Sequence, residues 1–188
     1  MHANWPDRPI VLVGLMGAGK TAVGRRLAKR LGLPFIDADH EIEQAAGCSI
    51  AEIFDQWGEA AFRDCERRVI RRLLGDEIQV LSTGGGAFID PETRNLVLDR
   101  GITVWLRAEL DVLVARTARR KTRPLLNAGN PREILTKLIA ARHPIYQEAP
   151  IVVDSTEDSI DATVDCVRAA IERHLAESVN VVATTTNG

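Results

Sequence analysis

Five short apolar runs are spaced along the chain, and segments with helical periodicity separate them. The runs span residues 8–14, 34–39, 79–83, 102–108 and 150–154. Runs of this length, bounded by glycine, proline or polar residues, are typical of buried strands. Strands that alternate with helices form a parallel sheet covered on both faces. The pattern therefore predicts an α/β fold of three layers, α/β/α, built on a five-stranded parallel sheet.

Two segments between strands are longer than a single crossover helix requires. The segment of about 38–74 has room for two or three helices, and Ser49 and Glu52 in it match a capping box. The segment of about 116–130 is basic and contains glycine. Insertions at these points flank the edge of the sheet where α/β proteins bind ligands. We expect the first to be a substrate-binding helical insertion and the second to be a lid.

We predict a single domain over residues 1–176. The 188 residues lie within the size range of one domain, and no change of composition marks a linker. Residues 177–188 show no helical period and end in small polar residues. We expect this tail to be disordered.

The composition argues against several classes of protein. A net charge of −2 and a pI near 6.1 give no global attraction to nucleic acid or membranes. Three cysteines and four histidines are scattered, without the spacing of a disulfide framework or a zinc site. No apolar run is long enough to span a bilayer, and Asp7 and two prolines interrupt the first ten residues. We expect a cytoplasmic protein that binds neither nucleic acid nor membranes.

A glycine-rich loop directly after the first predicted strand matches a phosphate-binding motif in full. Gly14, Gly19, Lys20 and Thr21 fill the fixed positions of G-x-x-x-x-G-K-[ST]. The backbone amides of such a loop cradle anions at a helix N-terminus, and the lysine adds positive charge for the outer phosphates. We expect this loop to bind ATP and the Thr21 hydroxyl to face Mg²⁺.

The loop alone does not distinguish a kinase from a GTPase, a motor or an ATP-gated switch. Guanine-specific GTPases usually carry N-K-x-D, and the chain contains no such string. This counts against a GTPase without excluding one. The choice among the other classes depends on the residues that would bind an acceptor.

Two carboxylates, Asp37 and Asp39, end the second predicted strand. By strand alternation we expect both side chains to point to the same face. One can hold the water shell of Mg²⁺, while the other orients an acceptor hydroxyl and takes its proton. The alternative for Asp39 is that it only caps the following helix.

A charged pair is predicted within the apolar face of a later helix. On a helical wheel, one apolar arc contains Phe62, Cys65, Val69, Ile70 and Leu73. Glu66 falls inside this arc and Arg63 lies at its edge, whereas Arg67, Arg68 and Arg71 point away and are expected to be solvated. A carboxylate in a buried stripe needs a partner, and Arg63 is within reach. Either the two residues form an internal ion pair that serves the fold alone, or Glu66 holds the Arg63 guanidinium in position to bind a planar anion such as a carboxylate.

Three consecutive glycines, Gly84, Gly85 and Gly86, follow the third predicted strand. Without side chains, their backbone amides can approach a ligand closely. Their place at a strand end favours a ligand-binding role over a plain turn.

A basic cluster occupies the predicted lid. It comprises Arg116, Arg119, Arg120, Lys121 and Arg123. A lid that closes over ATP excludes water, and one of its arginines can stabilise charge on the transferring phosphoryl group. A nucleic-acid patch is the rival interpretation, but the cluster has no aromatic neighbours and the chain is acidic overall.

Taken in order, these motifs resemble the shikimate kinase family. The similarity runs through GLMGAGKT, FIDADHEIE, FRDCE, STGGGA, TRPLL and RHPIYQEA, and covers nearly the whole chain to about Ser155. It implies a P-loop fold like that of nucleoside monophosphate kinases. It also implies transfer of the γ-phosphoryl group of ATP to the 3-hydroxyl of shikimate, in aromatic amino acid biosynthesis.

The resemblance implies roles on the nucleotide side. The ATP phosphates would be held by Gly17, Ala18, Gly19, Lys20, Thr21 and Ala22. Lys20 and Arg123 would be catalytic, Arg123 would meet the phosphates from the lid, and Arg116 would lie beside the adenine. Thr21 would serve Mg²⁺, with Asp37 supporting the water shell of the metal. Ala22 departs from the family pattern, in which a second hydroxyl residue often follows the threonine.

On the acceptor side, the resemblance implies that Asp39 binds substrate hydroxyls and acts as the base. Arg63 and Arg142 would grip the shikimate carboxylate, and Gly85, within the triple glycine, would contact the substrate. A small molecule with one carboxylate and several hydroxyls requires groups of these kinds.

Two alternatives remain open from the sequence. One is another small-metabolite kinase of similar build, such as a gluconate kinase, because the same arginines could hold other sugar-like acids. The other is a nucleotide-gated binding module without turnover, against which Asp39 and Arg123 argue. We expect a monomer whose partners are the small molecules shikimate and ATP.

Overall fold

The computed structural model describes residues 8–75, 77–118, 129–156 and 158–185, with side chains described as far as residue 177. Its sheet has five strands in the order β2-β3-β1-β4-β5, and every neighbouring pair is parallel. The strands are β1 (Ile10–Val13), β2 (Phe35–Asp37), β3 (Val80–Ser82), β4 (Ile102–Arg107) and β5 (Ile151–Asp154). The five-stranded parallel sheet predicted from the apolar runs is confirmed.

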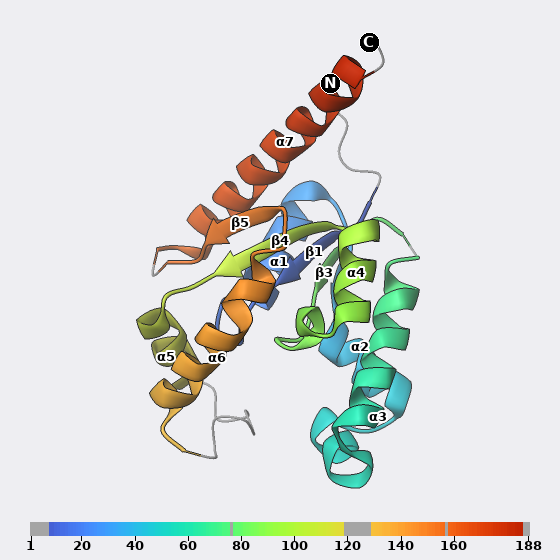
Figure 1. Ribbon diagram of the computed structural model, residues 1–188, viewed down its shortest axis with the longest axis vertical. Coiled ribbons are helices and arrows are strands. Elements are labelled where there is room, and N and C mark those ends of the chain that lie inside the picture. Colours follow the sequence, from blue (N-terminus) through green and yellow to red (C-terminus); the bar gives the residue numbers. More distant parts are fainter. Residues whose placement is uncertain (1–7, 76, 119–128, 157, 186–188) are drawn as a thin grey trace.

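Helices connect the strands and cover the sheet (Figure 1). They are α1 (Lys20–Leu31), α2 (Ala38–Ala46), α3 (Ile50–Leu73), α4 (Pro91–Arg100), α5 (Leu110–Ala118), α6 (Pro131–Tyr146) and α7 (Ile160–Thr185), with a short 3-10 helix η1 at Ala87–Ile89. Within the described ranges, no helix combines the length and the apolar character that crossing a bilayer requires.

The strand order sends the connections to opposite faces of the sheet. The chain leaves β1 toward β2 in one direction, whereas it passes from β3 to β4 and from β4 to β5 in the other. Because parallel crossovers are right-handed, α1 lies on one face, and α4 and α6 lie on the other. The last helix, α7, returns to the first face and packs against α1. The residues of β1 are fully buried between these layers.

The reversal of direction between β1 and β3 opens a crevice at the carboxyl edge of the sheet. These two strands are neighbours, and the helices that follow them lie on opposite faces. The loop after β1, the end of β2 and the triple glycine after β3 all meet at this edge. In open α/β sheets, ligands bind at such a point.

The first long insertion forms α2 and α3. Ser49 caps α3 in the predicted capping box, with reciprocal bonds between Ser49 and Glu52. Gly58, at φ 79° and ψ 178°, breaks the helical backbone within α3. The kink divides the helix into two parts, so the prediction of two or three helices in this segment agrees with the structure.

The last helix takes in residues 177–185, where the sequence analysis expected a disordered tail. The helix α7 continues to Thr185 and projects beyond the body of the protein (Figure 1). Residues 177–185 contain neither glycine nor proline, so no residue there ends the helix. At its base, Asp161 and Asp165 pair with Arg30 of α1, and Asp161 also pairs with Arg26.

Candidate active site

The loop after β1 has the conformation that its glycines permit. Gly14 and Gly19 have φ of 138° and 97°, in a region that other residues rarely adopt. A Cβ on Gly14 would also lie 2.5 Å from the Leu106 carbonyl oxygen, so no larger residue fits there. Gly19 is the N-cap of α1, whose first residue is Lys20. The motif is therefore folded as a loop at a helix N-terminus.

The ammonium group of Lys20 lies against this loop. The Lys20 side chain is buried, and Nζ donates hydrogen bonds to the carbonyl oxygens of Gly14 at 2.7 Å and Leu15 at 3.0 Å. A buried ammonium requires such acceptors, because an uncompensated charge away from water is costly. The positive charge is thereby held beside the backbone cradle that binds phosphates in loops of this kind.

Thr21 and Asp37 bring two oxygen ligands together. The Thr21 hydroxyl donates a hydrogen bond of 3.0 Å to Oδ2 of Asp37, which joins the start of α1 to the end of β2. Hydroxyl and carboxylate oxygens are the donors that Mg²⁺ prefers, and the ion is usually bound by one or two such groups together with phosphates and waters. In the described ranges, no group of three or more His, Cys, Asp or Glu residues could form a complete protein site for a metal ion. The pair therefore fits Mg²⁺ bound together with a nucleotide.

The sequence-based placement of Asp39 is corrected by the structure. The strand β2 ends at Asp37, and Asp39 lies in the first turn of α2, so strand alternation does not relate the two side chains. The capping role considered for Asp39 belongs to Asp37, whose side chain accepts a hydrogen bond of 3.2 Å from the Asp39 backbone amide. The chain turns into a helix there because the Asp37 carboxylate satisfies a free amide of the first turn.

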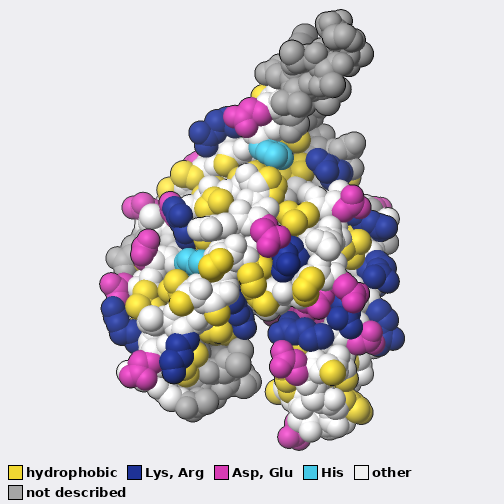
Figure 2. Space-filling model, viewed as in Figure 1, with side chains coloured by type: hydrophobic (Ala, Val, Ile, Leu, Met, Phe, Trp, Pro, Cys, Tyr) yellow, Lys and Arg dark blue, Asp and Glu magenta, His cyan; other side chains and the backbone are white. Residues whose placement is uncertain are grey.

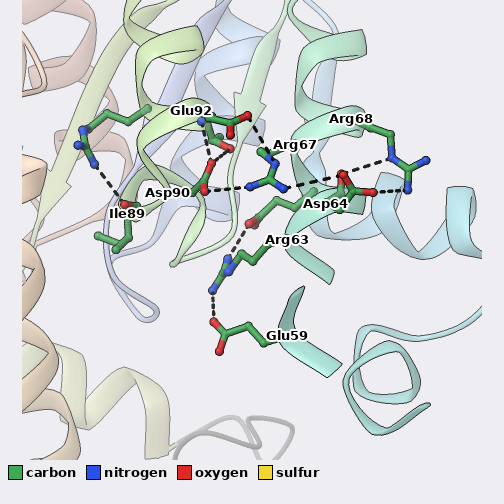
Figure 3. A network of polar contacts seen from close by, with 11 residues as sticks. Glu59, Arg63, Asp64, Arg67, Arg68, Ile89, Asp90 and Glu92 are labelled. Atoms are coloured by element: carbon green, nitrogen blue, oxygen red, sulfur yellow. Dashed lines mark hydrogen bonds and ion pairs between the residues drawn. The ribbon is translucent and has the colours of Figure 1, made fainter. Parts of the chain in front are cut away.

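Arg63 and Glu66 form the predicted pair on α3. Nη1 of Arg63 donates to Oε2 of Glu66 at 2.6 Å, and Nη2 reaches Glu59 at 3.4 Å. The Glu66 side chain is 1% exposed, whereas that of Arg63 is 24% exposed. Burial raises the pKa of Glu66 above its ordinary value, although the Arg63 guanidinium acts in the opposite direction. The Arg63 guanidinium is thus held by carboxylates of its own helix, and Figure 3 shows it extended toward Glu59.

The triple glycine lies against the two predicted acceptor-binding side chains. A Cβ on Gly84 would lie 2.7 Å from Oδ1 of Asp39, and a Cβ on Gly86 would lie 2.6 Å from Nη2 of Arg63. Such separations are shorter than carbon–oxygen or carbon–nitrogen contacts allow, so these glycines leave the space that Asp39 and Arg63 occupy. On the other side, a Cβ on Gly85 would lie 3.3 Å from the Met16 amide of the phosphate loop.

Arg142 joins this group from α6. Its Nη1 donates to the Gly85 carbonyl oxygen at 2.9 Å, and the hydroxyl of Tyr146 donates to the same oxygen at 2.6 Å. Tyr146 is a neighbour of the triple glycine that the sequence analysis did not single out. One signal could have found it, because Tyr146 follows Arg142 by four residues and therefore shares its helix face.

Arg116 lies beside the phosphate loop. Its Nη1 donates to the Ser155 hydroxyl at 2.9 Å and to the carbonyl oxygens of Gly17 and Ala18, each at 3.4 Å. Arg116 therefore connects the end of α5 and the segment after β5 to this loop. The remaining basic residues of the predicted lid, Arg119, Arg120, Lys121 and Arg123, lie outside the described residues.

Arg67 is not the solvated side chain that the helical wheel predicted. Its side chain is 29% exposed and contacts Asp90 at 3.3 Å, with Asp64 and Glu92 each at 3.9 Å (Figure 3). The wheel failed because it describes one helix, whereas Asp90 and Glu92 come from the neighbouring start of α4. Arg68 does point to solvent, with a side chain that is 71% exposed.

The space-filling view shows a notch at the edge of the molecule (Figure 2). One wall carries α2 and α3, and the other carries α5 and α6 (Figures 1 and 2). Lys and Arg side chains lie where the two walls meet. An anionic ligand that enters the notch therefore meets positive charge.

Comparison with known proteins gives one consistent family. A family model described as shikimate kinase matches residues 16–179. A shikimate kinase of Paramagnetospirillum magneticum is 59% identical over 157 residues, which cover 84% of this chain and 80% of the relative. The solved structure of shikimate kinase from Acinetobacter baumannii in complex with shikimate superposes with a TM-score of 0.85 at 39% identity, covering 89% of this chain and 94% of that one.

A gluconokinase structure from Sinorhizobium meliloti is also similar. It gives a TM-score of 0.60 at 21% identity and covers 93% of this chain and 96% of that one. At this identity, the likeness shows a shared fold and carries no argument about substrate.

Proposed function

The chain belongs to the shikimate kinase family, and from this premise we propose which role each site residue has in the transfer of a phosphoryl group from ATP to shikimate. The protein is a shikimate kinase, an ATP-dependent phosphotransferase of aromatic amino acid biosynthesis. The family and the fold predicted from the sequence are confirmed.

The phosphate loop binds the nucleotide. The residues of the cradle are Gly17, Ala18, Gly19, Lys20, Thr21 and Ala22. The position of Lys20 at the loop supports a role at the outer phosphates, where its charge offsets that of the γ-phosphoryl group. Arg116, which already contacts the loop carbonyls, lies at the nucleotide. The contact of Arg123 with the transferring phosphoryl group remains a prediction from the sequence.

Thr21 and Asp37 serve Mg²⁺. The contact between their oxygens supports this assignment, with the threonine hydroxyl facing the ion and the carboxylate holding its water shell. When bound with ATP, the ion neutralises charge on the β- and γ-phosphates.

Arg63, Arg142 and Asp39 bind shikimate. The two guanidiniums suit a planar carboxylate, because each offers parallel N–H donors. Asp39 accepts a hydrogen bond from the reacting hydroxyl and takes its proton as the new oxygen–phosphorus bond forms. The bond between the γ-phosphorus and the bridging oxygen breaks at the same centre, and ADP leaves with that electron pair. Backbone groups of Gly84, Gly85 and Gly86 line the substrate side of the site.

One observation carries this assignment. A Cβ added to Gly84 would overlap Asp39, and one added to Gly86 would overlap Arg63. Between them, the Gly85 carbonyl oxygen accepts a hydrogen bond from Arg142, and a Cβ added to Gly85 would lie close to Met16 of the phosphate loop. An acceptor base, two carboxylate-binding arginines and the nucleotide loop are therefore gathered around three residues. This is the set of groups that phosphoryl transfer to a carboxylated alcohol requires.

The proposal is tested by ADP release in a coupled assay. Release should require shikimate and Mg²⁺, and gluconate at the same concentration should not support it. Arg142→Lys and Arg63→Lys should each raise the KM for shikimate and leave the KM for ATP near the wild-type value. Wild-type KM values for shikimate in both variants would contradict the assignment of the carboxylate site.

We also propose that the enzyme acts as a cytoplasmic monomer. The low net charge and the presence of all the proposed site residues within one chain support this proposal. Sedimentation at the mass of one chain, 20.6 kDa, would agree with this, and a dimer at assay concentration would contradict it.

A further inference from the structure

The carbonyl oxygen of Gly85 accepts two hydrogen bonds from one helix. Tyr146 donates from its hydroxyl at 2.6 Å, and Arg142, one turn earlier on α6, donates from Nη1 at 2.9 Å. A backbone carbonyl has two lone pairs, so these two donors use its full capacity. The Gly85 carbonyl oxygen is therefore the atom through which these side chains of α6 bind the triple glycine.

The ring of Tyr146 is rigidly placed. Tyr146 is fully buried between two aromatic neighbours. Its ring centroid lies 6.0 Å from that of Phe88 and 5.7 Å from that of Trp105, with interplanar angles of 13° and 21°. Stacking of this kind fixes the plane of the ring, so the position of the hydroxyl is also fixed. Burial raises the pKa of the Tyr146 phenol, so that it remains a donor across the working pH range.

The triple glycine leaves room for two side chains of the proposed site. A Cβ added to Gly84 would lie 2.7 Å from Asp39, and a Cβ added to Gly86 would lie 2.6 Å from Arg63. The position of this segment therefore sets the space that is open to both side chains. The segment contains no side chain through which the protein could hold it, and among the described side chains only Tyr146 and Arg142 donate a hydrogen bond to the Gly85 carbonyl.

These contacts indicate a role for Tyr146 in the binding of shikimate, and this role rests on the proposed function. We propose that Tyr146 is a positioning residue for shikimate, which acts through the Gly85 carbonyl to hold Arg142 and the triple glycine in register with Arg63 and Asp39. Tyr146 does not touch the reacting atoms. Its hydroxyl shares an acceptor with Arg142, so loss of the hydroxyl frees the guanidinium and the segment together.

The test is Tyr146→Phe, which keeps the stacked ring and removes only the hydroxyl. The KM for shikimate should rise roughly five- to tenfold, as the loss of one buried hydrogen bond at the site implies, with the KM for ATP unchanged. The matched control is Thr103→Val. Thr103 is also fully buried and donates its hydroxyl to the Val97 carbonyl, at 3.3 Å, away from the site. The control should lower thermal stability without a change in either KM.

A purely structural role would give a different result. If Tyr146→Phe lowers stability as the control does and leaves the shikimate KM at the wild-type value, the inference is overturned. Arg142→Lys separates this failure from a failure of the proposed function. A raised shikimate KM in Arg142→Lys with none in Tyr146→Phe rejects only the role of Tyr146, whereas wild-type values in both reject the site itself.

A second measurement uses the unaltered protein. Tyr146 is the only tyrosine in the chain, so a sample labelled with carbon-13 at the phenol carbon gives one resonance. We expect this resonance to shift on saturation with shikimate, because ligation of Arg142 changes the hydrogen bonds at the shared carbonyl. A resonance that shikimate at saturation leaves unmoved would overturn the inference even if the phenylalanine variant failed to fold.

Discussion

The Thr21 hydroxyl donates a hydrogen bond of 3.0 Å to the Asp37 carboxylate. The two residues are sixteen positions apart, at the start of α1 and at the end of β2. Since β3 separates β2 from β1, this bond joins segments that follow two strands which are not neighbours in the sheet. The same bond connects the phosphate loop to the segment that carries Asp39. The proposed metal site and the proposed acceptor site are therefore linked by one hydrogen bond.

Asp37→Asn tests the metal assignment. The amide keeps the size of the side chain and loses its charge, so Mg²⁺ should be held less tightly. We expect the Mg²⁺ concentration that gives half-maximal activity to rise roughly 10- to 100-fold, the range found when groups that support a metal are lost. The measurement is activity against free Mg²⁺ at saturating ATP and shikimate. Asp165→Asn, an exposed carboxylate on α7, is the control and should leave the curve in place.

Asp39→Asn tests the proposed base. The substitution leaves the phosphate loop intact but removes the acceptor for the hydroxyl proton, so kcat should fall by about 10² to 10⁴. The dissociation constant of ATP, measured by calorimetry, should stay within about twofold of wild type, because Asp39 does not belong to the nucleotide cradle. A kcat equal to that of the wild type would show that Asp39 is not the base.

Gly86→Ala and Gly24→Ala separate site geometry from stability. A methyl group on Gly86 meets the guanidinium of Arg63, the end of a flexible side chain, so Arg63 moves. The shikimate KM should rise while the melting temperature changes little. A methyl group on Gly24 meets the partly buried Phe35 ring at 2.6 Å and the buried Leu12 side chain at 3.1 Å, which should cost about 1–2 kcal/mol of unfolding free energy after the gain in helix propensity. A Gly86→Ala variant with a much lower melting temperature and a wild-type KM for shikimate would contradict the proposed role of Gly86 in the shape of the site.

Arg63→Lys tests the need for a planar guanidinium. Lysine keeps the positive charge but lacks the two parallel N–H donors that fit a carboxylate. Its ammonium group also cannot reproduce the geometry of the Arg63 hydrogen bond to Glu66. We expect a rise in shikimate KM on the order of tenfold, with the KM for ATP unaffected. Arg68→Lys on the same helix is a suitable control, since that side chain is 71% exposed. Equal kinetics for the two variants would argue against a role of Arg63 in the clamp.

Asp90→Asn should reveal a pH-dependent contribution to stability. Burial raises the pKa of Asp90, but hydrogen bonds from Thr93 and the Arg67 guanidinium outweigh it, so the pKa lies below its ordinary value. A lowered pKa means that the unfolded chain binds more protons, so this contribution is present above the ordinary aspartate pKa and is lost as the pH falls through the folded value. The difference in unfolding free energy between wild type and Asp90→Asn should be largest near neutral pH and shrink on acidification below about pH 4. Urea titrations across this range measure it, and a difference that does not vary with pH would contradict the expectation.

Several features of the site could be predicted from local sequence because they depend on neighbours along the chain. Lys20 and Thr21 are adjacent to the glycines of their motif, and Arg63 lies one helical turn from Glu66. Helical spacing also placed Glu66 on the buried face, where the structure finds it 1% exposed. The roles of these residues toward ATP and shikimate remain predictions that the experiments above address.

Other features depend on which elements pack together. Strand alternation misplaced Asp39, because the carboxylate of Asp37 starts a helix where the strand was expected to continue. A wheel drawn on one helix could not show that the start of α4 supplies partners for Arg67. The sequence analysis did not expect α7 to reach Thr185, because the apolar period fades there, although residues 177–185 contain neither glycine nor proline.

The sequence by itself determined the five strands, the phosphate loop and the family, since apolar periodicity and motif spacing are local properties of the chain. Only the tertiary structure decided that Gly85 is the point at which Arg142 and Tyr146 meet, 57 and 61 residues away along the chain. The physical reason is that a backbone carbonyl has no side chain to mark it in the sequence. Its partners are fixed by the packing of α6 against η1 and α5, which depends on the whole core.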